Sequence, residues 1–264
     1  MHMTIDHKIL YDSEHISRDY ASRDYLEHAE KAFLDEYGSL TGSWAMLDMG
    51  VGGGRTTKYF APFVKSYIGA DYAPAMIRAC RKKYGDGYIF IDADARKMAM
   101  FKDCSFDFVL FSYNGIDSFS HRDRISALNE INRVLKTRGV FYFSSHNLDW
   151  AGLTDIFRMK NSPSKKKVPG IALRNIRLNL LNKSLDMEQH IEKLRKEKKG
   201  HLYDNSLNGK AKVYYITCHE QFSQLTRAGF TEIETYSRSG IKTRDESILN
   251  TGGWIYYFCR AKKP

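Results

Sequence analysis

The sequence predicts an α/β fold built on a mostly parallel sheet with helices on both faces. Apolar, strand-like runs alternate with amphipathic helical stretches between residues 44 and 143, which is typical of successive strand–helix units. The first run continues into a glycine-rich turn, and the second ends at an acidic residue. Ligands of parallel sheets bind beyond the carboxyl ends of the strands, so the same pattern also predicts where a site lies.

The first half of this pattern begins with a helix in which apolar or aromatic residues recur in steps of four. The segment Leu40-Thr41-Gly42-Ser43 ends it, and Pro74 stands where a helix favours proline, in its first turn. The expected elements are a helix over 11–37, a strand over 44–49, a helix over 55–64, a strand over 67–70 and a helix over 74–84.

The second half contains a continuous apolar strand, FDFVLF, typical of a buried strand, and an amphipathic helix with Ile125, Leu128, Ile131 and Leu135 on one face. The tail contains one more helix and two further strands. The expected elements are strands over 88–91, 106–111 and 140–143 with a helix over 121–136, then a helix over 217–228 and strands over 229–236 and 254–261.

Composition limits the class of protein. The 264 residues are 42% hydrophobic and carry a formal charge of +10, which fits one large domain, or a smaller one with an insertion, and excludes global disorder. No apolar run approaches the roughly 20 residues of a membrane span, and the start lacks a signal-peptide stretch. The four cysteines are widely spaced, so neither a disulfide framework nor a metal site is expected, and the protein is predicted to be cytoplasmic.

The glycine-rich turn is the strongest functional signal. Gly50, Gly52 and Gly54 follow a strand that contains Asp48, and Arg55 stands where a dinucleotide fingerprint would have its last glycine. Asp71 and Asp94 end the next two strands. An acid at the second strand end suits two ribose hydroxyls, and one at the third suits an adenine amino group. This set predicts a nucleoside ligand without phosphates.

Together these segments resemble class I S-adenosylmethionine-dependent methyltransferases. The resemblance runs from about Trp44 to Asn147 and lies in LDMGVGGGRTT, YIGADYAPAMI, DADARKM, SFDFVLFSYNGIDSF and EINRVLKTRGVFYFSSHN. It implies a Rossmann-like methyltransferase fold with a seven-stranded sheet that ends in an antiparallel hairpin, and S-adenosylmethionine as cofactor. The segments SYNGIDSF and SSHNLD are locally similar to glycine and amino-sugar N-methyltransferases.

The resemblance also implies roles for individual residues in cofactor binding. Asp48 would contact the methionine amino group, and Asp71 would hold the ribose hydroxyls. Departures from the family pattern are Val51 after the first glycine and Met98-Ala99-Met100 after the third strand. The full implied set is Asp48, Gly50, Gly52, Gly54, Asp71, Tyr72, Met76, Asp94, Ala95, Phe111 and Ser112.

Candidate catalytic residues follow the fourth and fifth strands. Histidine exchanges protons near neutral pH, so His146 is a candidate base for a hydroxyl acceptor, or a side chain that merely bonds a loop carbonyl. Tyr113 and Asn114 are candidates for orienting the acceptor, or they only cap the strand. Asn147 and the pair Arg174 and Arg177, three residues apart, are candidates for binding the acceptor, although arginines on a solvated helix are common.

Most of the excess positive charge lies in one segment. Residues 148–212 carry 15 Lys and Arg against 7 Asp and Glu, whereas the rest of the chain carries 26 against 24. We therefore expect an N-terminal helical cap (1–43), a cofactor-binding core (44–147), a basic insertion that acts as a lid for the acceptor (148–212) and a C-terminal completion of the sheet (213–264).

Three functional interpretations follow. The first is a methyltransferase acting on N or O of a small polar acceptor, expected to be anionic, such as a sugar, a sugar nucleotide or a natural-product intermediate. The second is an RNA methyltransferase that uses the basic insertion, although the chain lacks the Asn/Asp-Pro-Pro-aromatic signature of many base-methylating families. The third is a non-catalytic scaffold that binds the cofactor. The sequence leaves the acceptor and the oligomeric state open.

Overall fold

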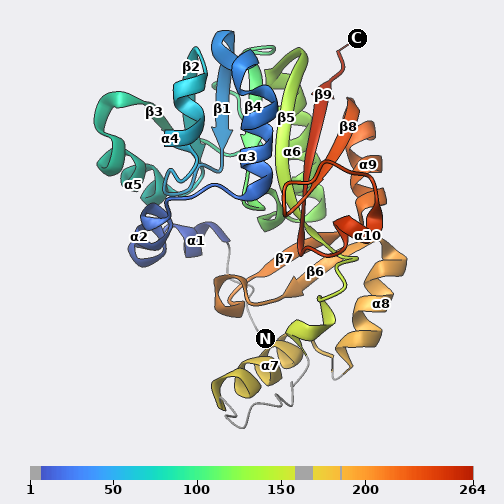
Figure 1. Ribbon diagram of the computed structural model, residues 1–264. Helices are drawn as coiled ribbons and strands as arrows, with labels where there is room; N and C mark the ends of the chain where they lie inside the picture. The colour runs from blue at the N-terminus through green and yellow to red at the C-terminus, as the bar shows by residue number, and fades with distance from the viewer. Residues whose placement is uncertain (1–6, 158–168, 185, 264) are drawn as a thin grey trace.

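The computed structural model describes residues 7–157, 169–184 and 186–263. Within them the strands form one nine-stranded sheet with helices on both faces (Figure 1). The strands are β1 (Ala45–Met49), β2 (Ser66–Asp71), β3 (Ile89–Asp92), β4 (Phe106–Phe111), β5 (Leu135–Asn147), β6 (Lys199–Tyr203), β7 (Lys212–Ile216), β8 (Phe230–Ser237) and β9 (Trp254–Ala261). The helices are α1 (His7–Tyr11), α2 (Glu14–Ser22), α3 (His28–Tyr37), α4 (Thr57–Phe60), α5 (Pro74–Tyr84), α6 (His121–Val134), α7 (Pro169–Leu181), α8 (Met187–Glu197), α9 (Cys218–Arg227) and α10 (Glu246–Leu249).

The main path of the sheet runs β3-β2-β1-β4-β5-β7-β6, and β9 pairs with both β5 and β8. The pairs among β1 to β5 are parallel, and β9 is antiparallel to its two neighbours. The predicted fold class is therefore confirmed, including the C-terminal antiparallel hairpin. The sheet has two strands more than expected, because β6 and β7 add a second hairpin.

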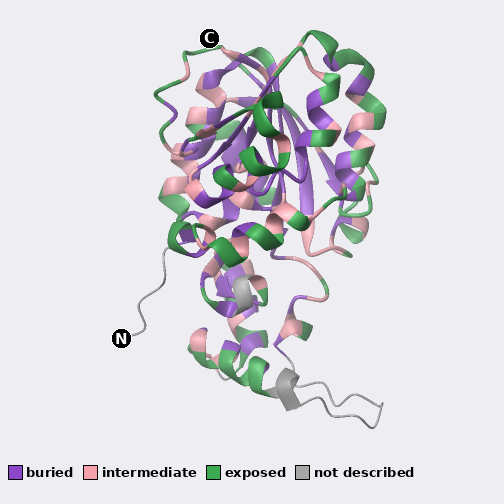
Figure 2. Ribbon diagram, turned by 90° about the vertical axis from the view of Figure 1, so that its left-hand side faces the viewer, coloured by how far each residue is buried: buried purple, intermediate pink, exposed green. Residues whose placement is uncertain are grey.

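Two apolar layers cover the sheet because successive residues of a strand point to opposite faces. In β4, Phe108 and Leu110 pack with α3, α4 and α5, whereas Val109 and Phe111 pack with α6 and α9. The strands are buried throughout their centre (Figure 2). The sheet edge where β1, β2 and β4 end is left for other segments to cover.

The N-terminal segment covers part of that edge, and its structure differs from the prediction. The single helix expected over 11–37 is wrong, because residues 23–27 leave the helical conformation between α2 and α3. Ser13 caps α2 by accepting a bond from the Ile16 amide, and Glu27 and Glu30 form a capping box that starts α3. These caps define new helix starts inside a continuous apolar period.

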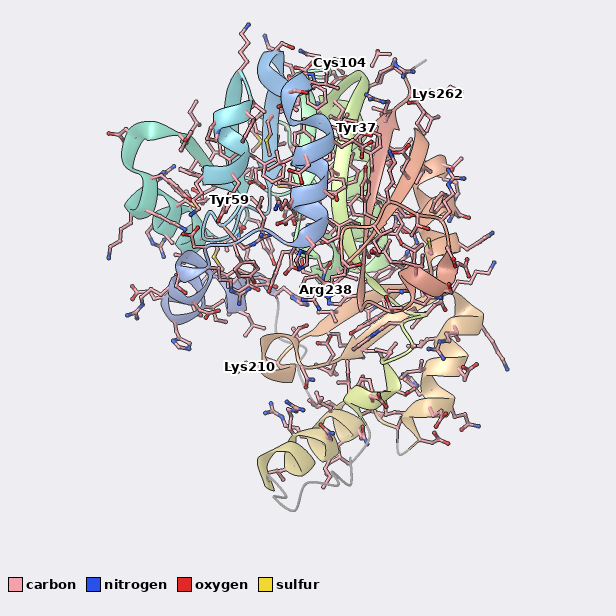
Figure 3. The ribbon with its side chains drawn as sticks, viewed as in Figure 1. Tyr37, Tyr59, Cys104, Lys210, Arg238 and Lys262 are labelled. Carbon is pink, nitrogen blue, oxygen red and sulfur yellow. The ribbon has the colours of Figure 1, made fainter. Side chains whose placement is uncertain are left out.

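The β6–β7 hairpin lies over the same edge. β4 pairs with β5 as far as Phe143, and β7 pairs with β5 at His146 and Asn147. Since β9 occupies the other side of β5 up to His146, β7 continues on the side of β4, just past its end. Figure 3 shows Arg238 at this end of the sheet and Lys210 beyond it, with Cys104 and Lys262 at the opposite end.

The core under α3 gives a stability prediction. Phe33 is fully buried and its ring lies 4.9 Å from Phe108 and 4.6 Å from Tyr142. We expect Phe33→Ala to lower the free energy of unfolding by about 3–5 kcal/mol, because it removes a core ring and leaves a cavity. Urea denaturation measures the change. Phe63→Ala is the control, since Phe63 is 49% exposed. Equal losses in both variants would contradict this description of the core.

Candidate active site

The glycine-rich turn joins β1 to the short α4. Gly50 has a φ of +65°, and a side chain there would meet the Phe111 ring at 2.5 Å. A Cβ at Gly53 would lie 2.2 Å from the Ala21 backbone nitrogen in α2. Glycine at these positions therefore permits both the left-handed turn and the close approach of the N-terminal helix. Helix α2 packs against the turn at Gly53, and β4 packs against it at Gly50.

A cavity, here named the main cavity, opens beside this turn at the carboxyl ends of β1, β2 and β4; its empty space, including the part open to solvent, is about 810 Å³. Its walls come from the glycine turn, the strand ends and the N-terminal helices. The lining residues are Tyr11, Tyr20, Arg23, Asp48, Met49, Gly50, Val51, Gly52, Gly53, Arg55, Thr56, Asp71, Tyr72, Met76, Ala93, Ala95, Phe111, Ser112, Tyr113, Gly115, Ser118 and Phe119.

Two buried carboxylates stand in the wall of the main cavity. Asp71 accepts bonds from the amides of Gly52 at 3.0 Å and Ala73 at 2.9 Å. Asp48 accepts bonds from the Thr56 hydroxyl at 2.5 Å and the Tyr67 hydroxyl at 2.8 Å. Burial raises the pKa of each carboxyl to about 6, although these hydrogen bonds favour the ionised form. Both carboxylates are charged at neutral pH and lose that charge in mild acid.

A buried ion pair ties the N-terminal segment to the turn. The Arg55 guanidinium donates to both carboxylate oxygens of Glu30 in α3, at 2.6 and 2.5 Å, and to the Tyr25 carbonyl at 2.9 Å. The Ser112 hydroxyl, just after β4, also donates to Glu30. Burial alone would lower the pKa of Arg55, but the hydrogen bonds with Glu30 and its charge raise it. This bidentate pair fixes α3 against the turn.

A second space, here named the side chamber, adjoins the main cavity; its empty space, including the part open to solvent, is about 720 Å³. Both are lined by Tyr11, Tyr20, Arg23, Tyr113 and Ser118. The side chamber is also lined by His7, Asn114, His146, Asn205, Ser206, Val213 and Trp254. A molecule in one space can therefore approach a molecule in the other past Tyr113.

His146 forms a short contact with a buried carboxylate at the wall of the side chamber. Its Nδ1 lies 2.7 Å from Asp117 Oδ2, and the His146 amide donates to the same oxygen at 2.6 Å. The other oxygen, Oδ1, accepts from Arg124 and from the Ser145 hydroxyl. Because an ionised carboxylate only accepts, Nδ1 carries its proton, and Nε2 is the nitrogen available to the chamber.

Tyr113 and Asn114 follow β4 with φ values of 55° and 60°. Two consecutive non-glycine residues in the left-handed region are uncommon, and such strain concentrates at functional sites. The Asn114 amide donates to Ser144 Oγ at 2.8 Å, and the Tyr113 hydroxyl lies 3.2 Å from that of Tyr25. The turn presents Tyr113 to both spaces and Asn114 to the side chamber.

Most residues expected around the cofactor do meet at the main cavity. Gly54 is an exception, because it packs against Tyr84 and Cys80 instead. Asp94 is a second exception: it does not line the cavity and forms an ion pair with Arg96 at 2.6 Å. Burial favours the neutral form of Asp94, but bonds from Arg96 outweigh it and hold its pKa below the ordinary value. Ala93 and Ala95 form this part of the wall. The residues brought together are Asp48, Gly50, Gly52, Asp71, Tyr72, Met76, Ala95, Phe111 and Ser112.

The three residues expected to bind the acceptor do not line either space. Asn147 is buried and bonds Asn250 at 2.9 Å, which holds the loop before β9. Arg174 and Arg177 are exposed on α7, which lies beyond the β6–β7 hairpin, away from the main cavity (Figure 1). The two arginines do lie on one helix, as their spacing predicts, but this helix projects away from the main cavity.

Sequence reasoning did not assign Arg23, Arg55, Asp117 and Trp254 to the site. Tyr11 and Tyr20, from the N-terminal helices, also line the main cavity. Arg55 directly follows the glycine turn, so its position was a usable signal. Trp254 begins β9 and faces Tyr113, with ring centroids 4.9 Å apart. That pairing depends on β9 lying beside β5, which the local sequence does not encode.

A known protein family matches the segment that carries most of this geometry. Residues 47–143 match a family model described as a methyltransferase domain. Residues 47–143 thus form a methyltransferase domain, consistent with the predicted class I S-adenosylmethionine-dependent methyltransferase. The predicted enzyme class and cofactor are confirmed at this level. A search of curated protein sequences found none that matches the chain.

Solved structures share the fold of the methyltransferase domain and of the segments around it. One is an S-adenosylmethionine-dependent methyltransferase from Clostridium acetobutylicum, with 11% identity, a TM-score of 0.61, and coverage of 92% of this chain and 94% of that one. Another, from Thermotoga maritima, has 17% identity, a TM-score of 0.55, and coverage of 97% and 100%. A third, a 1,6-didemethyltoxoflavin-N1-methyltransferase from Burkholderia thailandensis with S-adenosylhomocysteine bound, has 14% identity, a TM-score of 0.57, and coverage of 100% and 93%.

The main cavity fits the cofactor of the methyltransferase domain. Its polar groups include two buried carboxylates, Asp48 and Asp71, which suit the ammonium and hydroxyl groups of S-adenosylmethionine. Its apolar walls, with Met76, Ala95 and Phe119 among them, suit the adenine ring. No described helix is long and apolar enough to cross a membrane.

The carboxyl groups of the cavity predict a pH dependence of cofactor binding. Because the pKa of Asp71 is raised to about 6, this group is ionised at pH 7 and would then accept hydrogen bonds from the ribose hydroxyls of a bound cofactor. Lowering the pH from about 7 to about 5 should weaken S-adenosylhomocysteine binding about tenfold, measured by calorimetry, as the carboxylate is protonated. The protonation of Asp48 acts in the same direction.

Two variants sharpen this prediction. Asp71→Asn should bind S-adenosylhomocysteine weakly at neutral pH and show a smaller change between the two pH values. Asp86→Asn is the control, because Asp86 is exposed in the turn after α5. A wild-type affinity that stays constant across this range would contradict the assigned role of Asp71.

Proposed function

We propose that this protein transfers a methyl group from S-adenosylmethionine to an oxygen of a small acceptor, with His146 as the general base. The observation that supports this most directly is the 2.7 Å contact between His146 Nδ1 and the buried Asp117, at the wall of a chamber that adjoins the main cavity. A histidine oriented by a carboxylate is a common arrangement for removing a proton from a hydroxyl.

The cofactor and the chain contribute different parts of this reaction. Bound S-adenosylmethionine supplies a methyl group on a positively charged sulfur, which keeps the bonding electrons when the acceptor oxygen attacks the methyl carbon. His146 Nε2 takes the hydroxyl proton, and the Asp117 carboxylate stabilises the resulting imidazolium through Nδ1. Tyr113 lies between the two spaces and orients the acceptor toward the main cavity. The N-terminal helices α1 and α2 cover the main cavity and exclude water from it.

An acceptor that is small, rather than RNA, is supported by the placement of the basic segment. The exposed Arg174 and Arg177 lie on α7, and neither lines the side chamber. Of the described residues in segment 148–212, Asn205 and Ser206 line it, and both are neutral. We propose that this segment covers the acceptor mainly through the β6–β7 hairpin, while its charge remains solvated.

Labelling of a cell extract tests the proposed function. We expect the protein, given methyl-labelled S-adenosylmethionine and a deproteinised extract, to place the label in the low-molecular-mass fraction, as a methyl ether identified by mass spectrometry. Label in the RNA fraction alone would overturn the proposal in favour of RNA methylation. Tight cofactor binding without any labelled product would overturn it in favour of a scaffold.

The base is tested separately with His146→Gln. We expect this variant to lower the rate of labelling of the low-molecular-mass acceptor by about 10²–10⁴-fold, because the proton acceptor is lost. S-Adenosylhomocysteine affinity should stay at the wild-type value, which also reports correct folding. His15→Gln is the matched control, since His15 is exposed on α2. A His146→Gln variant as active as this control would exclude His146 as the base.

A further inference from the structure

The side chamber has properties that restrict its ligand more narrowly than methyl transfer requires. Its walls combine the N-terminal helices, the turn after β4, the ends of β5 and β9 and the hairpin region around Asn205. Each of these segments comes from a different part of the chain. The side chains that these segments contribute determine which ligands the chamber can bind.

Aromatic rings form a continuous part of that wall. The ring of Tyr113 lies 4.9 Å from that of Trp254, at an interplanar angle of 72°, and 6.5 Å from that of Tyr20, at 84°. Trp254 also lies 6.2 Å from the His146 ring. Edge-to-face rings at this spacing favour another planar ring, which can stack on one and meet the edge of the next. The base therefore stands within an aromatic enclosure.

The charge of the chamber has one sign. Among the residues that the structure describes, its lining includes Arg23 and the histidines His7 and His146, but no aspartate or glutamate. Arg23 lies 4.0 Å over the Tyr20 ring, and its ion pair with Asp19 involves a carboxylate that is 59% exposed. Such a solvated pair is weak, so the guanidinium remains available to an anion. An ammonium group in the chamber would find no carboxylate among the lining residues.

One buried polar atom at the chamber lacks a partner. Asn114 is only 6% exposed, and its Oδ1 has no hydrogen-bond partner within the described part of the chain. An unsatisfied buried acceptor is costly, and native structures seldom retain one without a reason. A hydroxyl donor on a bound ligand would satisfy Asn114 Oδ1, and His146 lines the same chamber.

We infer that the side chamber binds planar aromatic hydroxyl compounds that carry a carboxylate or no charge, and excludes those that carry an ammonium group. Tyr113 and Trp254 contact the ring, Asn114 and His146 contact the hydroxyl, and Arg23 selects the charge. This inference rests on the proposed function for the assignment of the chamber as the acceptor site, but it concerns binding alone.

Four probes that differ by one property each test the inference. Calorimetry with the full chain saturated with S-adenosylhomocysteine measures 4-hydroxyphenylacetate, 4-methylphenol, tyramine and 4-hydroxycyclohexylacetate. We expect 4-hydroxyphenylacetate to bind at least about tenfold more tightly than tyramine, with 4-methylphenol between them. The saturated 4-hydroxycyclohexylacetate should bind more weakly than its aromatic counterpart.

A pair of variants assigns the charge preference. Arg23→Gln should remove the advantage of 4-hydroxyphenylacetate over 4-methylphenol. Arg18→Gln should retain it, because Arg18 lies in the preceding helix α2 and its side chain is 78% exposed. Tyramine binding as tightly as 4-hydroxyphenylacetate, equal binding of the saturated and aromatic acids, or no binding of any probe would each overturn the inference.

The outcomes separate this inference from the proposed function. The expected order of binding, together with an extract that yields no methyl ether, would support the chamber and contradict the proposed reaction. A methyl ether formed on a low-molecular-mass acceptor, together with a reversed order of binding, would support the reaction and contradict the inference.

Discussion

The geometry of this site depends on the Asp117 carboxylate. It is fully buried and accepts four hydrogen bonds, from Arg124, the Ser145 hydroxyl, the His146 amide and the His146 ring. Arg124 is fully buried as well, and its positive charge pairs with the negative charge of Asp117. Removing either side chain would leave an unpaired charge in the core. Arg124 also donates to Gln221 in α9. One carboxylate thus connects the turn after β4, α6, β5 and α9, and sets the direction of the histidine.

A second buried pair performs a similar task on the other side of the main cavity. The Glu30 carboxylate accepts hydrogen bonds from Arg55 and Ser112. These bonds join the start of α3 to the residue after the glycine turn and to the residue after β4. Glycine at position 53 lets α2 approach the turn. The N-terminal helices are therefore part of the cavity wall. The cavity and the chamber share that wall, which explains how one segment can position both cofactor and acceptor.

The sequence predicted the fold well because its signals were local. The strand pattern, the glycine turn and the acids at strand ends each lie within a few residues, and Asp48 and Asp71 do reach the main cavity. Predictions that required knowledge of a neighbour were less accurate. Asp94 was expected to face adenine, but Arg96, two residues later, binds its carboxylate. Arg174 and Arg177 lie on a helix whose direction depends on the β6–β7 hairpin, which was not expected. Trp254 reaches the site only because β9 inserts beside β5.

The tautomer of His146 provides the most direct test of the account. Nitrogen-15 NMR of the full chain, labelled in its histidines and assigned by comparison with His146→Gln, distinguishes the two ring nitrogens. We expect a protonated Nδ1 whose proton is shifted downfield by the bond to Asp117, with Nε2 unprotonated in the neutral ring. The Nε2 resonance should also shift when 4-hydroxyphenylacetate is added. A neutral ring protonated at Nε2 would contradict the account, because that nitrogen could not accept the proton of a hydroxyl.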